Sequence, residues 1–219
     1  MTDQLTLSPR IEEVKDLVQN ANPSPDGNRI VVEARGELFS VPAEHGPVIN
    51  LTNTSGIAER YPAWSPNGKH IAYWSDASGE YELHLMDMEK NTSMKISSFG
   101  KGFRYNIYWS PNSEKIAFVD QSMTIRVYDV KEKELQKVDQ GLYMMEGALR
   151  GFEPSWSSDS RWLAYSRSVD NQNRAIFIFD TKEGKSKQVT SGYYADNSPA
   201  FDPDGKYLYF VTNLSLIHI

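Results

Sequence analysis

One short phrase recurs five times along the chain, and its spacing constrains the fold more than any single residue does. Each copy follows a Trp-Ser-Pro-like frame, and the marker residues of that frame are Ser24, Ser65, Ser110, Ser157 and Asp202. Successive markers are 41, 45, 47 and 45 residues apart. A repeat of this length that is made of short strands is typical of a β-propeller blade of about four strands.

The second repeat shows the predicted blade most clearly. Short apolar or alternating segments fall at residues 61–64, 71–74, 81–87 and 92–97. Turn-forming residues separate them, and Asn67-Gly68 can take the positive φ values of a tight hairpin. The third and fourth repeats carry Ser113 and Ser160 where glycine is usual, so we expect those turns to be longer or strained.

The sequence therefore predicts an all-β fold, a β-propeller arc of about four to five four-stranded blades that forms an incomplete ring. We expect residues 1–21 to be the end of a preceding blade or a linker. An apolar hexapeptide at 214–219 breaks the pattern, and we interpret it as a non-native tail. The predicted blades cover approximately residues 22–60, 61–104, 105–152 and 153–197, with a partial blade at 198–213.

Composition excludes several classes of function. The 219 residues carry a formal net charge of −6, so there is no basic stripe for nucleic acid. No run of 18 apolar residues is present, and the first residues lack the pattern of a signal peptide. The chain has no cysteine, so it has no disulfide. We expect neither nucleic acid nor a membrane as a partner.

Catalytic chemistry is hard to place on this sequence. His45, His70 and His84 stand outside any recognisable nucleophile motif, and no two histidines have the spacing of metal ligands. We therefore predict no catalytic residue, no metal and no cofactor in this chain. Trp64 and Trp109 occupy one frame position, as does Trp156. We expect the three rings to pack between adjacent blades rather than to bind sugar.

Polar residues just ahead of each first strand are the candidates for function. The first strand of a blade lines the central channel of a propeller, so its leading residues can guide a peptide there. The candidate channel residues are Glu59, Arg60, Arg104, Tyr105, Glu153 and Asn197. The alternative is that these side chains only solvate loops and form salt bridges between blades.

Two phrases carry a more specific signal than the repeat. These are Glu-Ala-Arg-Gly-Glu at residues 33–37 and Ser-Gly-Glu-Tyr-Glu-Leu at residues 78–83. The chain resembles the tricorn protease family, in particular the opening blades of its second, seven-bladed propeller, most strongly over residues 22–87. The resemblance implies a piece of a large serine peptidase whose nucleophile, base and oxyanion hole lie beyond this region.

The resemblance also implies a role. It predicts a non-catalytic segment that gives peptides access to a peptidase domain of the same parent chain, in a cytoplasmic homo-oligomer. The alternative is a periplasmic translocation-type propeller that docks a partner protein. A third class, a sugar- or lactone-processing propeller enzyme, would need clustered axial acids or metal ligands that the sequence does not show.

Overall fold

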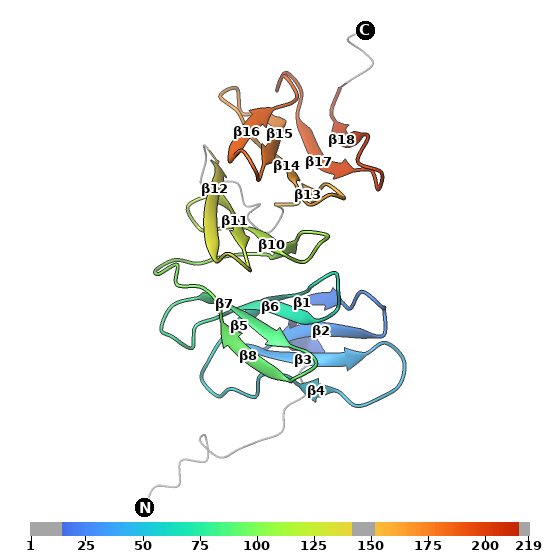
Figure 1. Cartoon of the computed structure of the whole chain (residues 1–219), viewed down its shortest axis with the longest axis vertical. Coiled ribbons are helices and arrows are strands. Elements are labelled where there is room, and N and C mark those ends of the chain that lie inside the picture. The colour runs from blue at the N-terminus through green and yellow to red at the C-terminus, as the bar shows by residue number, and fades with distance from the viewer. Residues whose placement is uncertain (1–14, 142–151, 215–219) are drawn as a thin grey trace, which may run out of the picture.

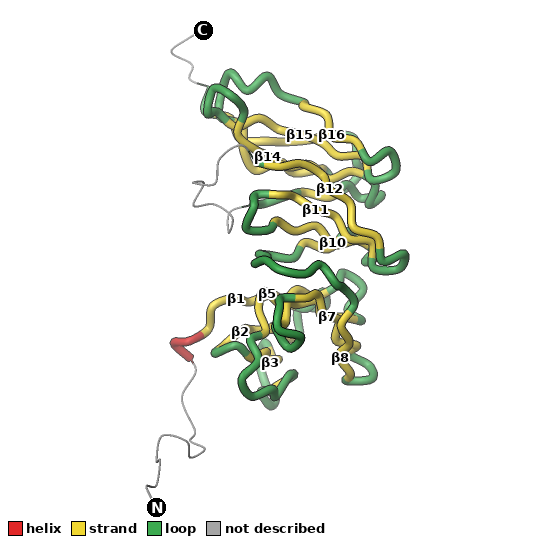
Figure 2. Tube along the Cα trace, turned by 90° about the vertical axis from the view of Figure 1, so that its left-hand side faces the viewer, coloured by secondary structure: helices red, strands yellow, loops and turns green. Residues whose placement is uncertain are grey.

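The computed structural model describes residues 15–141 and 152–214, which form antiparallel sheets that stand side by side (Figures 1 and 2). Four sheets have four strands each, in the order of the chain, and a fifth has two. The sheets remain unclosed, so the all-β partial propeller is confirmed. Within these residues, no helix has the length and apolar character that crossing a bilayer requires.

Each four-stranded sheet is one blade. Blade 1 contains β1 (Val18–Pro23), β2 (Arg29–Ala34), β3 (Glu37–Pro42) and β4 (Ile49–Asn50). Blade 2 contains β5 (Glu59–Trp64), β6 (His70–Ser75), β7 (Glu82–Asp87) and β8 (Thr92–Lys95). Blade 3 contains β9 (Tyr108–Trp109), β10 (Lys115–Val119), β11 (Thr124–Asp129) and β12 (Glu134–Gln140).

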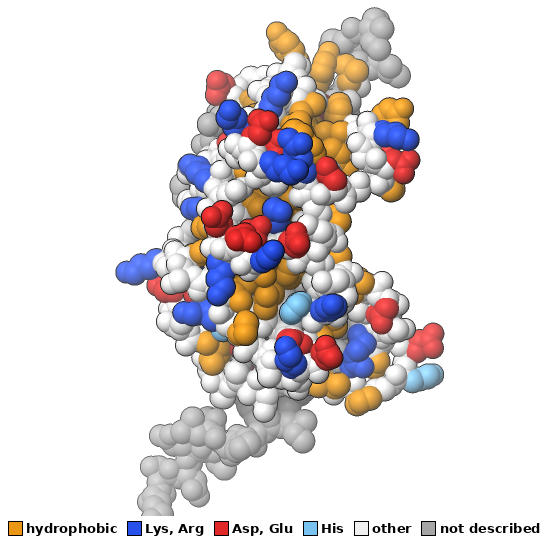
Figure 3. All heavy atoms as spheres, in the orientation of Figure 1, with side chains coloured by type: hydrophobic (Ala, Val, Ile, Leu, Met, Phe, Trp, Pro, Cys, Tyr) orange, Lys and Arg blue, Asp and Glu red, His pale blue; other side chains and the backbone are white. Residues whose placement is uncertain are grey.

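The fourth blade repeats the plan, and the fifth sheet is shorter. Blade 4 contains β13 (Ser155–Trp156), β14 (Trp162–Ser168), β15 (Arg174–Asp180) and β16 (Lys185–Gln188). Blade 5 contains β17 (Asp196–Phe201) and β18 (Leu208–Thr212), and a 3-10 helical turn at Lys15–Leu17 precedes blade 1. The fourth strands lie at the outer rim, whereas β1, β13 and β17 lie nearer a hollow on the right-hand side (Figures 1 and 3).

Several first strands begin earlier than the repeat suggested. β1 starts at Val18, which pairs with Ala34, rather than at residue 22. β5 starts at Glu59 and β17 at Asp196, ahead of the predicted limits of 61 and 198. The predicted tail at 214–219 lies outside the described residues except for Leu214.

The hydrophobic core lies between blades rather than within one sheet. Blades 1 and 2 share a small cluster that includes Leu38 and Ile71. Blades 2 and 3 share a larger one around Trp74 and Phe118, and blades 3 and 4 share a third around Tyr165. A single sheet cannot cover its own faces, so each blade depends on its neighbours for stability.

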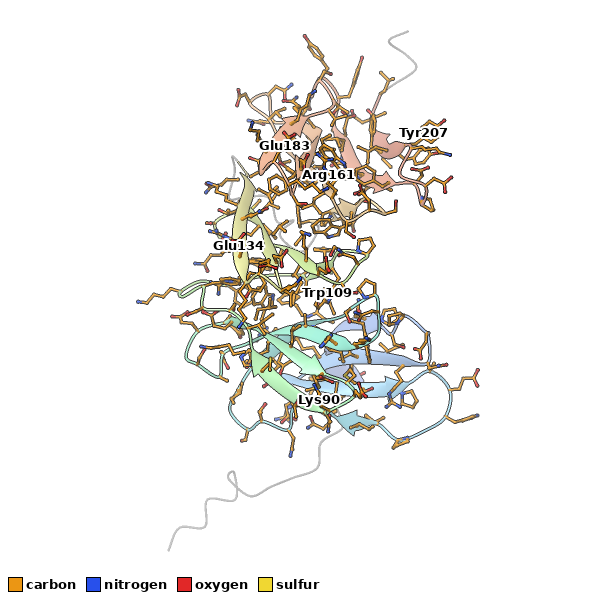
Figure 4. All side chains as sticks on the ribbon, in the orientation of Figure 1. Lys90, Trp109, Glu134, Arg161, Glu183 and Tyr207 are labelled. Carbon is orange, nitrogen blue, oxygen red and sulfur yellow. The ribbon has the colours of Figure 1, made fainter. Side chains whose placement is uncertain are left out.

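Two of the three repeated tryptophans are hydrogen-bonded to the preceding blade, and Trp64 packs against the cluster between blades 1 and 2. The indole Nε1 of Trp109 donates to the carbonyl of Ala63 at 3.1 Å, and that of Trp156 to the carbonyl of Tyr108 at 3.2 Å. Figure 4 shows Trp109 at the boundary between blades 2 and 3. The prediction that these rings pack between blades is confirmed.

The serine-containing turns adopt the glycine conformation. Ser113 has φ 62° and Ser160 has φ 60°, close to the 71° of Gly68. The turn keeps its length, and the serine is strained. The serine hydroxyls also accept hydrogen bonds from the preceding blade, Ser113 from the backbone N of Asn67 at 3.1 Å and Ser160 from that of Asn112 at 3.0 Å. An extra bond between blades therefore accompanies the strain.

Candidate functional site

The six candidate channel residues occupy the starts of four first strands. Glu59 and Arg60 open β5, and Asn197 is the second residue of β17. Arg104 and Tyr105 precede β9, with Arg104 forming an isolated bridge to Asp120. Glu153 precedes β13 and is exposed.

Two of these first strands contain a β-bulge. The register of β5 shifts between Arg60 and Ala63, where Tyr61 has φ 53°. The register of β17 shifts between Asn197 and Ala200, where Ser198 has φ 49°. A bulge re-aims the side chains ahead of it, which is why simple alternation along the strand could not give their directions.

The residues of blades 2 and 3 converge on Tyr81. Arg60 donates from Nε to the Tyr81 hydroxyl at 3.0 Å, and Arg104 donates to the Tyr81 carbonyl. The Tyr105 ring packs edge-on against Phe103 with centroids 5.0 Å apart. Arg60 and Arg104 thus share Tyr81 as a partner, whereas Glu59 and Tyr105 have other partners.

Glu153 and Asn197 stand in other blades and have separate partners. Asn197 accepts a hydrogen bond from Arg174 at 3.3 Å. The negative charge of Glu153 adds to the effect of burial in raising the pKa of Tyr108. A role for the six as one channel lining remains a prediction.

Glu59 lies in a pocket between blades 1 and 2. The cavity measures about 340 Å³. Its polar part is formed by Thr52, Thr54, Glu59, Tyr73, Ser75, His84, Asn91 and Ser93. Glu59 is only 2% exposed; the Thr54 hydroxyl donates to its Oε1 at 2.6 Å, while its Oε2 has no hydrogen-bond partner. Burial raises the pKa of Glu59; the hydroxyls of Thr54 and Thr52 offset part of this effect, and the nearby charges of Glu37 and Asp76 add to it.

His84 lines the same pocket from β7. Its Nε2 is buried without a hydrogen-bond partner, and its ring lies 5.6 Å from that of Tyr73. Burial lowers the pKa of His84, and the charge of Lys95 lowers it further, so the imidazole is neutral at neutral pH. Because Nε2 is unpaired, no serine hydroxyl stands in position for it to act as a base.

A second pocket occupies the equivalent place between blades 2 and 3. It measures about 260 Å³ and is lined by Phe99, Lys101, Gly102, Arg104, Asp120, Gln121, Ser122, Arg126 and Leu135. Strand register shows that His84 and Arg126 are equivalent positions. His84 pairs with Tyr73 in blade 2, and Arg126 pairs with Phe118, the residue equivalent to Tyr73, in blade 3.

The loops give the same correspondence. The backbone N of Leu38 donates to the Thr52 hydroxyl, and in the next repeat the backbone N of Leu83 donates to the Ser97 hydroxyl. Thr52 and Ser97 are therefore equivalent, and so are Thr54 and Phe99, which lie two residues after them. Counting five residues further places Glu59 where the next repeat has Arg104.

The second pocket supplies its own charges. Arg126 donates from Nε to Asp120 at 2.9 Å. The Arg104 guanidinium lies over the Phe99 ring at 5.3 Å and donates to the carbonyls of Gly100 and Gly102, each at 3.0 Å. The two pockets therefore share a location and differ in charge.

Sequence reasoning missed two buried carboxylates. Glu33 is 2% exposed and accepts from the backbone N of Tyr61 at 3.0 Å. Burial opposes ionisation of Glu82, but hydrogen bonds from Ser97, Phe99 N and Gly100 N hold its pKa below the usual value. The signal for Glu33 is an acid inside the apolar strand β2, whereas Glu82 stands at the start of β7.

Over residues 15–141 and 152–214, no three His, Cys, Asp or Glu side chains gather as a metal site would require.

The comparisons with known proteins agree with this architecture. The sequence profile of the tricorn protease second β-propeller domain matches residues 18–216. The chain belongs to the tricorn protease family. It is 25% identical over 210 residues to a tricorn protease homolog from Saccharolobus solfataricus, which covers 96% of this chain and 18% of that protein.

Solved structures show the same fold. A crystal structure of the tricorn protease matches with a TM-score of 0.79 and 19% identity, covering 94% of this chain and 20% of that one. A structure described as TolB from Agrobacterium tumefaciens matches with a TM-score of 0.63 and 19% identity, covering 90% of this chain and 70% of that one. The chain spans about a fifth of the length of the tricorn relative.

Proposed function

We propose that this chain is a non-catalytic propeller segment of a tricorn-type serine peptidase and that it gives peptides access to the active site. The match to the second propeller domain over residues 18–216 carries the proposal. The unpaired Nε2 of His84 agrees with it, because the described part of the chain offers no serine–histidine pair through that atom. In this proposal the parent protein is a cytoplasmic homo-oligomer.

The candidate channel residues supply the access function. Arg60 is part-exposed at the start of β5, and Glu153 is exposed ahead of β13. Charges of both signs at the leading ends of first strands can orient a peptide through hydrogen bonds and electrostatic attraction. Arg104 is buried and held by three backbone carbonyls, so its part is to position the loop before β9.

Two assays test this proposal. The 219-residue chain should not hydrolyse a fluorogenic peptide; turnover that His84→Ala abolishes would contradict the non-catalytic role. In a tricorn-type peptidase that contains this segment, Glu153→Lys should change KM for long charged peptides and leave kcat for a dipeptide substrate unchanged. Equal effects on long and short substrates would contradict the access role.

A partner-docking propeller is the second candidate, and the likeness to TolB favours it. That likeness rests on 19% identity and covers 70% of the TolB chain, so it reflects the shared fold. Under this alternative, Glu153→Lys would weaken a stoichiometric complex with a partner protein and leave peptide hydrolysis unaffected. Size-exclusion chromatography of a complex recovered from the native cell separates the two candidates.

A further inference from the structure

We propose that the pocket between blades 1 and 2 binds a guanidinium-type cation, which donates N–H groups to Glu59 and His84. This site lies between the sheets, and it uses Glu59, one of the six candidate channel residues, as a buried ligand rather than as a group that faces the channel. Three features of the described residues support it. A buried carboxylate oxygen lacks a hydrogen-bond donor, the nearby charges are mainly negative, and the equivalent pocket between blades 2 and 3 contains two arginine side chains.

The unmet acceptor is Glu59 Oε2. Its partner oxygen, Oε1, is bonded to Thr54, so the carboxylate is oriented with its second oxygen buried and free. A buried acceptor without a partner destabilises the folded chain, and a ligand that supplies N–H donors would remove that penalty. His84 Nε2 is a second buried group at the same cavity that lacks a partner.

The local field favours a cation. Glu37 and Asp76 act electrostatically on Glu59, and neither Lys nor Arg lines the cavity. Lys95 acts on His84, and it lies outside the lining residues. With His84 neutral, the cavity holds one carboxylate and no positive charge of its own.

The next interface shows what the fold accommodates at this place. There, Arg104 stands at the position of Glu59 and Arg126 at that of His84, so two guanidinium groups belong to the protein itself. The pocket between blades 1 and 2 has a carboxylate instead, and Thr54 stands where Phe99 does. We infer that a cation from outside takes the place that the protein's own arginines take one blade later.

The probe is methylguanidinium chloride, titrated into the full 219-residue chain at neutral pH and low ionic strength. Isothermal titration calorimetry should show saturable binding of one equivalent with Kd on the order of millimolar or tighter. Tetramethylammonium chloride has the same charge but no N–H donor and should not bind. Equal responses to both salts, or no saturable response to methylguanidinium, would overturn the proposal.

Two variants locate the site. Glu59→Gln should weaken binding about tenfold or more, because it removes the charge of the carboxylate. Glu44→Gln makes the same change of net charge on an exposed loop and should bind as the parent chain does. Thr54→Phe keeps the carboxylate but fills the space as Phe99 does, and it should abolish binding.

Circular dichroism checks that each variant is folded. If Glu59→Gln does not fold, the loss of methylguanidinium binding in Thr54→Phe is the test of the site. Unchanged affinity in a folded Glu59→Gln or Thr54→Phe variant would refute the site.

A second titration distinguishes an arginine side chain from a small free guanidinium compound as the natural ligand. The tripeptide Gly-Arg-Gly should bind as tightly as methylguanidinium if the natural ligand is an arginine side chain. Weaker binding of the tripeptide, with methylguanidinium still dependent on Glu59, assigns the site to a small free guanidinium compound. Either result supports the cation site.

Discussion

The interface between blades 1 and 2 and the interface between blades 2 and 3 are built on one backbone plan and differ in what they bury. The second interface is aromatic: Trp74 and Phe118 lie edge to face at 4.9 Å, and Phe99 packs on Phe118 at 5.8 Å. The first places the carboxylate of Glu33 at the position of Trp74, as their pairing with Leu38 and Leu83 shows.

The comparison shows that the repeat determines where each interface and its pocket lie, but not which side chains are buried there. Equivalent hydrogen bonds hold the loops and strands of both interfaces, from Leu38 N to Thr52 and from Leu83 N to Ser97. Within that frame, blade 3 closes its side with rings and paired arginines. The interface between blades 1 and 2 instead leaves Glu59 Oε2 and His84 Nε2 without partners in a cavity, which lowers local stability and opens a space for a ligand.

Trp74→Ala should have the largest effect on this contrast. Trp74 is fully buried, and its indole N donates to the Tyr105 carbonyl at 2.8 Å. Its loss leaves a cavity between blades 2 and 3 and should cost about 3–5 kcal/mol of unfolding free energy. Urea denaturation followed by fluorescence measures it, with Trp162→Ala, at a half-buried position, as control. Equal losses for both variants would mean that burial of Trp74 between blades 2 and 3 contributes no more than a half-buried tryptophan does.

Ser113→Ala should have the next largest effect. It keeps the unfavourable φ of 62° and removes the hydroxyl that accepts from Asn67 N, so we expect a loss of about 1–2 kcal/mol. Ser113→Gly removes both the bond and the strain, and it should be nearly neutral.

The first interface lacks this bond because Gly68 stands at the equivalent position. Gly68→Ser has open space around the new side chain but strains the backbone at φ 71°, so it should lower stability by about 1 kcal/mol. Thermal melts of the three variants test the balance, and a Gly variant at Ser113 that is less stable than the Ala variant would contradict it.

Glu59→Gln should have the smallest effect and the opposite sign. At pH 7 the ionised carboxylate is buried with one oxygen unpaired, so the amide should raise stability by about 1 kcal/mol or less. The folded-state pKa of Glu59 is raised, so its unfavourable contribution is present at neutral pH and disappears as the pH falls through that raised pKa.

The stability gap between Glu59→Gln and the parent chain should therefore begin to narrow as the pH is lowered from about 7, in measurements taken down to about pH 5. Asp180 does not interfere in this window. Arg161 lowers the pKa of Asp180 to about 2, so the stability it contributes is constant above about pH 5 and is lost only in stronger acid. A gap that widens on acidification would show that Glu59 is not buried as a carboxylate.

The sequence predicted the architecture well because the repeat encodes it. Turn residues such as Asn67-Gly68 and the frame tryptophans recur once per blade, and local chemistry is enough to place them. The strain at Ser113 and Ser160 also followed from the missing glycine. The channel role of the leading residues is still a prediction.

The pocket could not be predicted in the same way. Glu59 and His84 are far apart in the sequence and lie on β5 and β7 of one sheet, with β6 between them, and the loop after β4 completes the cavity that both line. The bulge at Tyr61 shifts the register of β5, so counting along the strand does not give the direction of Glu59. Only the three-dimensional structure shows that Glu59 Oε2 is left without a hydrogen-bond partner.

The bonds from Trp109 to Ala63 and from Trp156 to Tyr108 give the arc a sense of direction. In both bonds the donor belongs to the later blade and the acceptor to the earlier one. During synthesis, the acceptor strand therefore leaves the ribosome before the tryptophan that binds it. Growth of this array can proceed from the amino end one unit at a time, without waiting for the carboxyl end.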